Sequence, residues 1–216
     1  MPRLRFAPEG WLFVIPFVIL AAAALLMQWY IAGILFSAIA AFLLNFFRDP
    51  HRLGSERHVD VLSPADGTVV QIKDVDEASV WPGLTKQVSI FMSVFDVHVN
   101  RAPISGKIVH YRYNSGKNLA AMVEKSSSEN EQNLVVITDR RGATVAFKQI
   151  AGLLARRIVF DKKEGDEVVR GDRVGMIKFG SRVDVFFPRD VNLKVGMRDK
   201  VKVALTVLAE IGEHEA

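Results

Sequence analysis

The sequence WLFVIPFVILAAAALLMQWYIAGILFSAIAAFLLNFF, residues 11–47, carries no charged side chain. As one helix it would be about 55 Å long, whereas the hydrocarbon core of a bilayer is about 30 Å thick. A single straight span therefore does not fit. Two shorter helices do, for instance Trp11–Met27 and Ile31–Phe47, with a turn at residues 28–30 whose amide and aromatic side chains suit the interface. The run predicts an N-terminal helical membrane hairpin.

Positive charge flanks this hairpin on both sides. Arg3 and Arg5 precede it, and Arg48 and Arg52 follow it. Because positively charged flanks tend to stay in the cytoplasm, both ends of the hairpin are expected there. A cleaved signal peptide is the alternative, but the run is too long for one and no small-residue cleavage site precedes a polar segment. Residues 1–50 are therefore interpreted as a membrane anchor.

Composition excludes several kinds of site. The 216 residues include no cysteine, which excludes disulfides, zinc–thiolate sites and thiol nucleophiles. No histidine spacing matches a metal site, so no metal is expected. The net charge of +4 favours an anionic lipid surface. Nucleic acid is not an expected partner, because no dense Lys/Arg stripe or binding motif is present.

Residues 51–216 show a different pattern, in which short β-branched runs alternate with turn residues such as Asp66-Gly67 and Gly171-Asp172. The pattern predicts a mostly β (β-rich α+β), largely antiparallel domain. A short helix is expected at Asn118–Lys125 and a polar loop at Ser126–Asn133. The candidate strands are Thr68–Ile72, Val88–Met92, Lys107–Tyr111, Leu134–Thr138, Ala143–Ile150, Arg173–Lys178, Val183–Phe187 and Val201–Leu208.

Three segments of this domain offer side chains for nucleophilic chemistry. They are SPADG at 63–67, DVHVNRAP at 96–103 and FGSRV at 179–183. Together they supply an acid, an imidazole and a hydroxyl, namely Asp66, His98 and Ser181. Each segment alone is weak evidence, because Asp-Gly is usually a turn, a lone histidine is usually structural, and Gly-Ser pairs are common in loops.

The surroundings of Ser181 argue against an ordinary serine hydrolase. The pattern G-x-S-x-G is absent, since Arg182 and Val183 follow the serine. Gly180 precedes it within a strand-like stretch, and a glycine leaves its own carbonyl sterically open. The Gly180 carbonyl is therefore a plausible target for the Ser181 hydroxyl.

In this order and spacing the three segments resemble the phosphatidylserine decarboxylases, specifically their short membrane-anchored bacterial class. The resemblance covers essentially the whole chain, from the apolar run to the short piece after Gly180-Ser181. It implies a carboxy-lyase that is made as a proenzyme and converts phosphatidylserine into phosphatidylethanolamine and CO₂.

The resemblance also implies how the proenzyme matures. His98, oriented by Asp66, removes the proton of Ser181, and the oxygen attacks the Gly180 carbonyl to give an ester. Elimination then cuts the chain between Gly180 and Ser181 into a β chain of residues 1–180 and an α chain of residues 181–216. The dehydroalanine left at position 181 hydrolyses to a pyruvoyl group and ammonia.

The implied cofactor is this pyruvoyl group, whose carbonyl takes up the substrate amine and accepts electrons on decarboxylation. His98 is the candidate proton donor in that step. The implied partners are phosphatidylserine and membrane lipid. The β and α chains are expected to form a heterodimer, and two such heterodimers could assemble into a dimer. The catalytic domain is expected on the cytoplasmic face of a bacterial inner membrane.

The chain departs from the longer bacterial members at Arg101. Those members carry H-x-x-H where this chain has His98-Val99-Asn100-Arg101. Either His98 serves both maturation and decarboxylation, or the roles in these two steps are distributed among the residues differently than in the longer members. Arg101 is the candidate for binding the lipid phosphate or the substrate carboxylate, because its planar fork suits bidentate contacts. A solvated loop cation or a membrane-surface contact is the alternative.

Two other functions are compatible with parts of the sequence. Residues 102–108 and 164–172 resemble the half-motifs of biotinyl and lipoyl carrier domains, which favours a non-enzymatic membrane adaptor with a carrier-like β domain. Such an adaptor would remain one uncut chain. A decarboxylase acting on a different serine lipid, for instance an ether-linked one, keeps the chemistry and changes the substrate.

Overall fold

The computed structural model describes residues 4–52, 54–116, 130–152, 158–178 and 181–212. The chain divides into two compact units, Met1–His51 and Arg52–Ala216. The first unit contains the apolar run, and the second contains all three segments with candidate catalytic residues.

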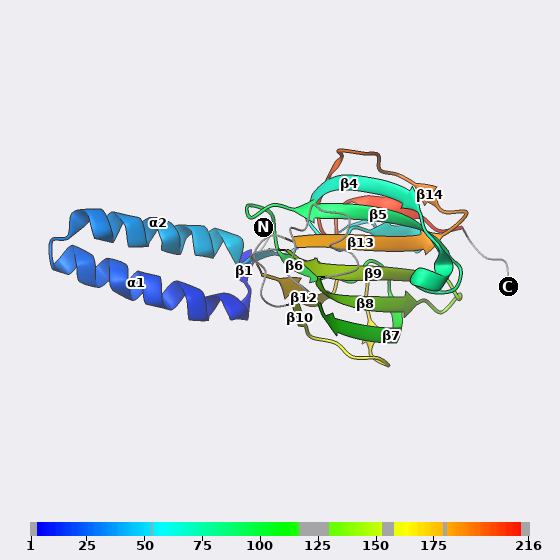
Figure 1. Ribbon diagram of the computed structural model, residues 1–216, viewed down its shortest axis with the longest axis horizontal. Helices are drawn as coiled ribbons and strands as arrows, with labels where there is room; N and C mark the ends of the chain where they lie inside the picture. The colour runs from blue at the N-terminus through cyan, green and yellow to red at the C-terminus, as the bar shows by residue number, and fades with distance from the viewer. Residues whose placement is uncertain (1–3, 53, 117–129, 153–157, 179–180, 213–216) are drawn as a thin grey trace. The chain divides into compact units, whose positions relative to one another are not determined.

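The first unit is a helical hairpin whose ends are joined by a short antiparallel ladder (Figure 1). Strand β1 (Leu4–Phe6) pairs with β2 (Arg48–Pro50). Between them lie the 3₁₀ turn η1 (Pro8–Gly10) and the helices α1 (Trp11–Leu26) and α2 (Tyr30–Phe46). The predicted helical hairpin is confirmed, with bounds within one residue of those expected. Gln28 forms the reversal in the left-handed region, at φ 61°.

The hairpin helices present apolar side chains to their surroundings. Leu12, Leu26 and Ile31 are each more than four-fifths exposed. The stretch Pro8–Leu26 is 19 residues long and apolar enough to cross a membrane, whereas Tyr30–Phe46 carries no charged residue but is shorter. Exposed apolar surface of this extent is typical of contact with lipid.

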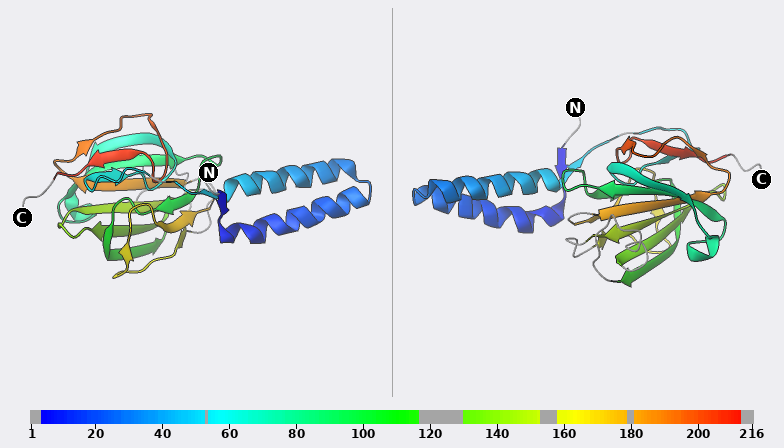
Figure 2. Two further views of the ribbon diagram at one scale, coloured as in Figure 1. Left: turned by 180° about the vertical axis from the view of Figure 1, so that it is seen from behind. Right: turned by 45° about the horizontal axis from the view of Figure 1, so that its top comes forward.

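The second unit is built on one curved antiparallel sheet of eight strands (Figures 1 and 2). β-Branched and aromatic residues fill its long central strands, as is usual for a pleated surface buried on both faces. The predicted mostly β, antiparallel domain is confirmed. In spatial order the strands are β11 (Glu167–Val168), β7 (Gly106–Ser115), β8 (Glu131–Thr138), β9 (Thr144–Ala151), β13 (Ser181–Pro188), β5 (Leu84–Met92), β4 (Gly67–Asp74) and β15 (Lys200–Val201).

Two three-stranded sheets carry the remaining candidate segments. In one, β10 (Ile158–Phe160) and β6 (Val99–Arg101) flank β12 (Arg173–Ile177), so β6 begins directly after His98. In the other, β14 (Asn192–Leu193) and β3 (Asp60–Leu62) flank β16 (Val207–Glu210). The segment of residues 63–67 begins where β3 ends.

The predicted continuous strand Val201–Leu208 is wrong. The chain forms β15 and β16 instead, with Ala204 between them in the left-handed region at φ 58°. This turn lets the Ala204 amide donate to the Ser63 carbonyl at 2.9 Å and the Val203 amide to Asp66 Oδ1 at 2.7 Å. Tertiary hydrogen bonds therefore outweigh the β propensity of the segment.

The polar segment after residue 116 also differs from expectation where it is described. The expected helix Asn118–Lys125 lies outside the described residues, as do residues 126–129 of the expected loop. Residues 131–133, predicted to be loop, belong to β8. Glu131 is buried there because its carboxylate accepts bonds from the Tyr113 hydroxyl at 3.0 Å and the Ile158 amide at 3.1 Å.

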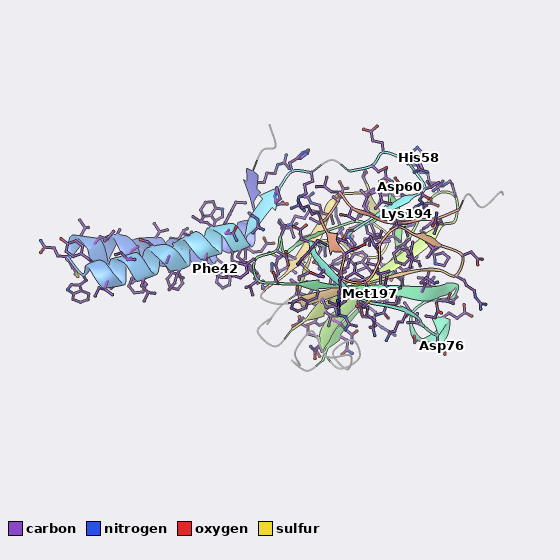
Figure 3. The ribbon with its side chains drawn as sticks, turned by 90° about the horizontal axis from the view of Figure 1, so that it is seen from above. Phe42, His58, Asp60, Asp76, Lys194 and Met197 are labelled. Atoms are coloured by element: carbon purple, nitrogen blue, oxygen red, sulfur yellow. The ribbon has the colours of Figure 1, made fainter. Side chains whose placement is uncertain are left out.

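Strand β13 separates two apolar clusters, because alternate side chains of a strand point to opposite faces. Val183, Val185 and Phe187 belong to the main core, whereas Phe186 packs in a smaller cluster with Leu84 and Leu134. The segment 75–81 packs against that smaller cluster and contains the 3₁₀ turn η2 (Glu77–Ser79). Asp76, labelled in Figure 3, caps η2 by accepting the Ala78 amide at 3.0 Å.

Candidate active site

Ser181 is the first residue of β13 and is fully buried. It lies between Met92 of β5 and Ala151 of β9 in the ladder register. Its hydroxyl donates to the Met92 thioether at 3.3 Å. The predicted partner in cleavage, Gly180, lies outside the described residues. The structure thus describes the predicted nucleophile as a serine enclosed between strands.

His98 is also fully buried, at the start of β6. Its Nδ1 lies 3.0 Å from the Asp96 carbonyl oxygen, and its own carbonyl accepts the Ile177 amide at 3.3 Å. A carbonyl can only accept, so Nδ1 carries the proton in this geometry. Nε2 is then the basic nitrogen of the neutral imidazole.

Asp66 contacts a cation rather than the imidazole in this structure. Its carboxylate accepts from both terminal nitrogens of Arg52, one of them at 3.0 Å, and from the Val203 amide at 2.7 Å. Both side chains of the ion pair are largely buried. The predicted role of Asp66 in orienting His98 remains a prediction. The ion pair with Arg52 gives Asp66 a structural role in addition.

Asn100 joins two of the three candidate segments. Its amide nitrogen donates to the Pro64 carbonyl at 3.1 Å, and the backbone amide of Arg101 donates to the same carbonyl, also at 3.1 Å. The Asn100 nitrogen also lies 3.9 Å from the Met92 sulfur, which accepts the Ser181 hydroxyl. A single thioether is therefore shared between the histidine segment and the serine.

A chain of buried amides extends from Asn100 into the main sheet. Gln149 of β9 donates to Asn100 Oδ1 at 2.7 Å, and Asn133 of β8 donates to Gln149 Oε1 at 2.8 Å. All three side chains are fully buried. Buried polar networks that satisfy each member rigidify their surroundings. Hereafter Asn133, Gln149 and Asn100 are called the amide chain.

Arg101 is half-buried at the end of β6. Its guanidinium donates to the Gly171 carbonyl at 2.8 Å, and its backbone pairs with Arg173 of β12. This contact holds β6 against the Gly171-Asp172 turn. The predicted binding of substrate by Arg101 is not tested by this contact and remains a prediction.

Comparison with known proteins gives the family of the chain. The family model described as phosphatidylserine decarboxylase matches residues 39–209. Relatives named phosphatidylserine decarboxylase proenzyme occur in Magnetococcus marinus, 39% identical over 97% of both chains, and in Solibacter usitatus, 47% identical over 88% of this chain and 90% of that protein. Another, from Amoebophilus asiaticus, is 45% identical over 85% of this chain and 81% of that protein.

The chain belongs to the phosphatidylserine decarboxylase family. The name proenzyme on these relatives describes precursors that are processed. The resemblance found from the three segments is confirmed at the level of the family.

Two structural features around Ser181 and His98 in this phosphatidylserine decarboxylase family member were not predicted from the sequence. Asn133 follows Glu131 and Gln132 in a run that was predicted to be a polar loop, and Gln149 follows Lys148 in β9. In the sequence, nothing distinguishes Met92 from an ordinary core residue. Only Asn100 had a sequence signal, since it lies two residues after His98.

Proposed function

We propose that the chain is a phosphatidylserine decarboxylase proenzyme, which converts phosphatidylserine into phosphatidylethanolamine and CO₂ after cutting itself between Gly180 and Ser181. The observation that carries the proposal is the burial of Ser181 beside the Met92 sulfur that Asn100 also contacts. This contact brings the serine and the histidine segment to one buried location, as a self-processing reaction requires.

In the proposed maturation, the Ser181 hydroxyl attacks the carbonyl that precedes it. His98 Nε2 is the base for the hydroxyl proton, because Nδ1 donates to the Asp96 carbonyl. The N-to-O acyl shift moves the acyl group of residue 180 to the Ser181 oxygen. Loss of the Ser181 α-proton then releases that group as a carboxylate, which ends the β chain at residue 180 and leaves a dehydroalanine at position 181. Its imine tautomer takes up one water molecule and releases ammonia, which leaves the pyruvoyl group.

The surroundings of Ser181 fit the small uncharged pyruvoyl group that this reaction would leave at position 181. Met92 and Ala151, both fully buried, flank the site. When present, such a group supplies the electron sink that decarboxylation of an α-amino acid needs.

We further propose where the reaction takes place. The substrate is a membrane lipid, and residues 1–50 would hold the domain at the bilayer through the exposed apolar hairpin. Arginines on both flanks of the hairpin favour the cytoplasmic side of a bacterial inner membrane. Arg101 is the proposed contact for the phosphate or carboxylate of the lipid, because its planar guanidinium suits bidentate contacts.

The test compares two buried serines. Ser181→Ala removes the nucleophile, so we expect one uncut chain that releases no CO₂ from phosphatidylserine. Ser89→Ala is the matched control, because Ser89 is equally buried in the neighbouring strand β5 and faces Asp184 rather than Ser181. It should be cut and active. His98→Ala should strongly slow cutting. Normal cutting of Ser181→Ala, measured by denaturing intact mass, contradicts the proposal.

A further inference from the structure

A pocket of about 720 Å³ lies on the face of the main sheet opposite to Ser181. Asp184 and Phe186 line it, and both are out of phase with Ser181 along β13, so they point to the other side of the sheet. Ser79 and Val80 of the η2 region also line the pocket. It is therefore separate from the candidate active site.

The ladder register places cations side by side in this pocket. Leu134 of β8 pairs with Lys148 of β9 on one side and with Arg112 of β7 on the other, and all three line the pocket. The backbones of Lys148 and Arg112 are two strands apart, or about 10 Å. Long side chains from these positions can reach one shared ligand. Lys73 of β4 lines the same pocket from the other side.

The cations on the pocket lining outnumber the carboxylates among the described residues. Asp184 is the one carboxylate among the described residues that line it. That carboxylate is already held by Arg182, at 2.7 Å and 2.9 Å, in a pair that is almost completely buried. Arg112 and Lys148 therefore leave an excess of positive charge at the pocket.

Lys148 is in an unfavourable environment for a cation. Burial lowers the pKa of its ammonium group, Asp184 raises it, and the nearby charges of Arg112 and Arg182 lower it further. Its nitrogen lies 5.6 Å from the centre of the Phe186 ring. An anion placed between Lys148 and Arg112 would relieve the repulsion between these cations.

The lining also provides neutral hydrogen-bond donors and an apolar floor. Gln87 and Gln132 are polar groups on the lining, whereas Leu134, Phe186 and Val80 are apolar. Cations and amide donors above an apolar floor suit a phosphate that carries an organic substituent.

We propose that this pocket binds a phosphate-bearing anion, with Lys148 and Arg112 as its principal contacts and Lys73 at the rim. A phospholipid headgroup and a soluble phosphate share this chemistry. The site is a second binding site, distinct from the one in which phosphatidylserine is decarboxylated.

The experiment titrates the full-length, detergent-solubilised protein by calorimetry at constant ionic strength. One arm uses inorganic phosphate, and the other uses a soluble short-chain phosphatidylglycerol, with short-chain phosphatidylcholine in parallel as the zwitterionic comparison. Lys148→Met and Arg112→Gln each remove one cation. Lys163→Gln is the matched control, because Lys163 is exposed and does not line the pocket.

We expect Lys148→Met and Arg112→Gln each to weaken binding by about tenfold or more, and Lys163→Gln to leave it unchanged. Binding of phosphate in the wild type supports a site for soluble anions, and binding of the anionic lipid alone supports a site for a headgroup. Arg112 is exposed, so its variant should fold even if Lys148→Met does not.

Absence of binding by both probes, or equal binding by all variants, would overturn the proposal. The proposal would also be overturned if Lys148→Met and Arg112→Gln raised the KM for phosphatidylserine by the same factor as they weaken phosphate binding. The pocket would then belong to the active site. Processing is read separately by intact mass. An uncut chain that still binds phosphate through Lys148 would therefore contradict the proposed function and support this second site.

Discussion

The contacts observed for Asp66 differ from the contact with His98 that its proposed role in maturation requires. Its carboxylate binds Arg52 and the Val203 amide, both within the described domain. An asparagine would keep one acceptor for Val203 and lose the ion pair. We expect Asp66→Asn to lower the free energy of unfolding by about 2–3 kcal/mol, because it leaves a largely buried guanidinium unpaired. Urea denaturation measures this loss.

A second variant separates the structural role of Asp66 from its proposed role in maturation. Arg52→Met breaks the same ion pair and leaves the carboxylate in place. If Asp66 also assists His98, Arg52→Met should cut itself faster than Asp66→Asn when the two are compared at equal fractions of folded protein. Equal rates of cutting would show that Asp66 acts only through the fold.

The sequence suggested Ser181 and His98 as candidate reactive residues, but it did not suggest the buried residues that form hydrogen bonds around them. Ser181 and His98 belong to short segments whose residue types suggest chemistry. Gln149 belongs to no such segment, and its importance depends on Asn100, which lies 49 positions away in the chain. A contact between distant strands leaves no local signal in one sequence.

At the scale of the strands, the amide chain ties β8 and β9 to β6. Gln149→Leu would leave Asn100 Oδ1 and Asn133 Nδ2 buried without their partner, at a cost of about 1–3 kcal/mol for each group. We expect this variant to be less stable and to cut itself more slowly, because β6 carries His98. The rate of cutting is read from the two chains on a denaturing gel.

Gln87→Leu is the control for this prediction. Gln87 is a buried glutamine of β5 that lies on the opposite face of the sheet and donates to Ser89 at 2.8 Å. It should cut itself at the wild-type rate. Equal slowing in both variants would mean that loss of stability, and not the position of β6, limits maturation.

Gly67 marks a close approach between β4 and β5. A Cβ atom at this position would lie 2.2 Å from the Phe91 carbonyl oxygen, next to Met92 in sequence. Gly67→Ala must therefore push the two strands apart, and we expect it to cost more than about 2 kcal/mol. Gly142→Ala is the comparison, because its Cβ would meet no atom within 4 Å, although its positive φ adds some strain. Thermal unfolding should show a clearly larger loss for Gly67→Ala.

The centres of the long strands could be predicted because β-branched runs and Gly-Asp turns report local structure. The segment from Val201 to Leu208 could not, because the turn at Ala204 depends on hydrogen bonds to Ser63 and Asp66. The positions of β6 beside β12 and of β3 beside β16 also follow from pairing between distant segments.

At the scale of the whole molecule, the chain divides between His51 and Arg52. A protein that begins at Arg52 keeps the partner of Asp66. We expect it to remain in solution without detergent and to cut itself normally. Its decarboxylation of phosphatidylserine in vesicles should be at least about tenfold slower than that of the full chain, because the anchor no longer concentrates it at the lipid.

A protein that begins at Gly54 provides the contrast. It lacks Arg52 and should share the behaviour of Arg52→Met. If both truncated proteins act on vesicles as fast as the full chain, the proposed role of residues 1–50 as an anchor is wrong.

The central claim is that the protein makes its own electron sink from Ser181. Denaturing intact mass of a catalytically active preparation tests this claim most directly. We predict two polypeptides, residues 1–180 with a free carboxylate and residues 181–216 with a pyruvoyl group in place of Ser181. An active preparation that contains only the full-length chain with an unmodified Ser181 would contradict the account.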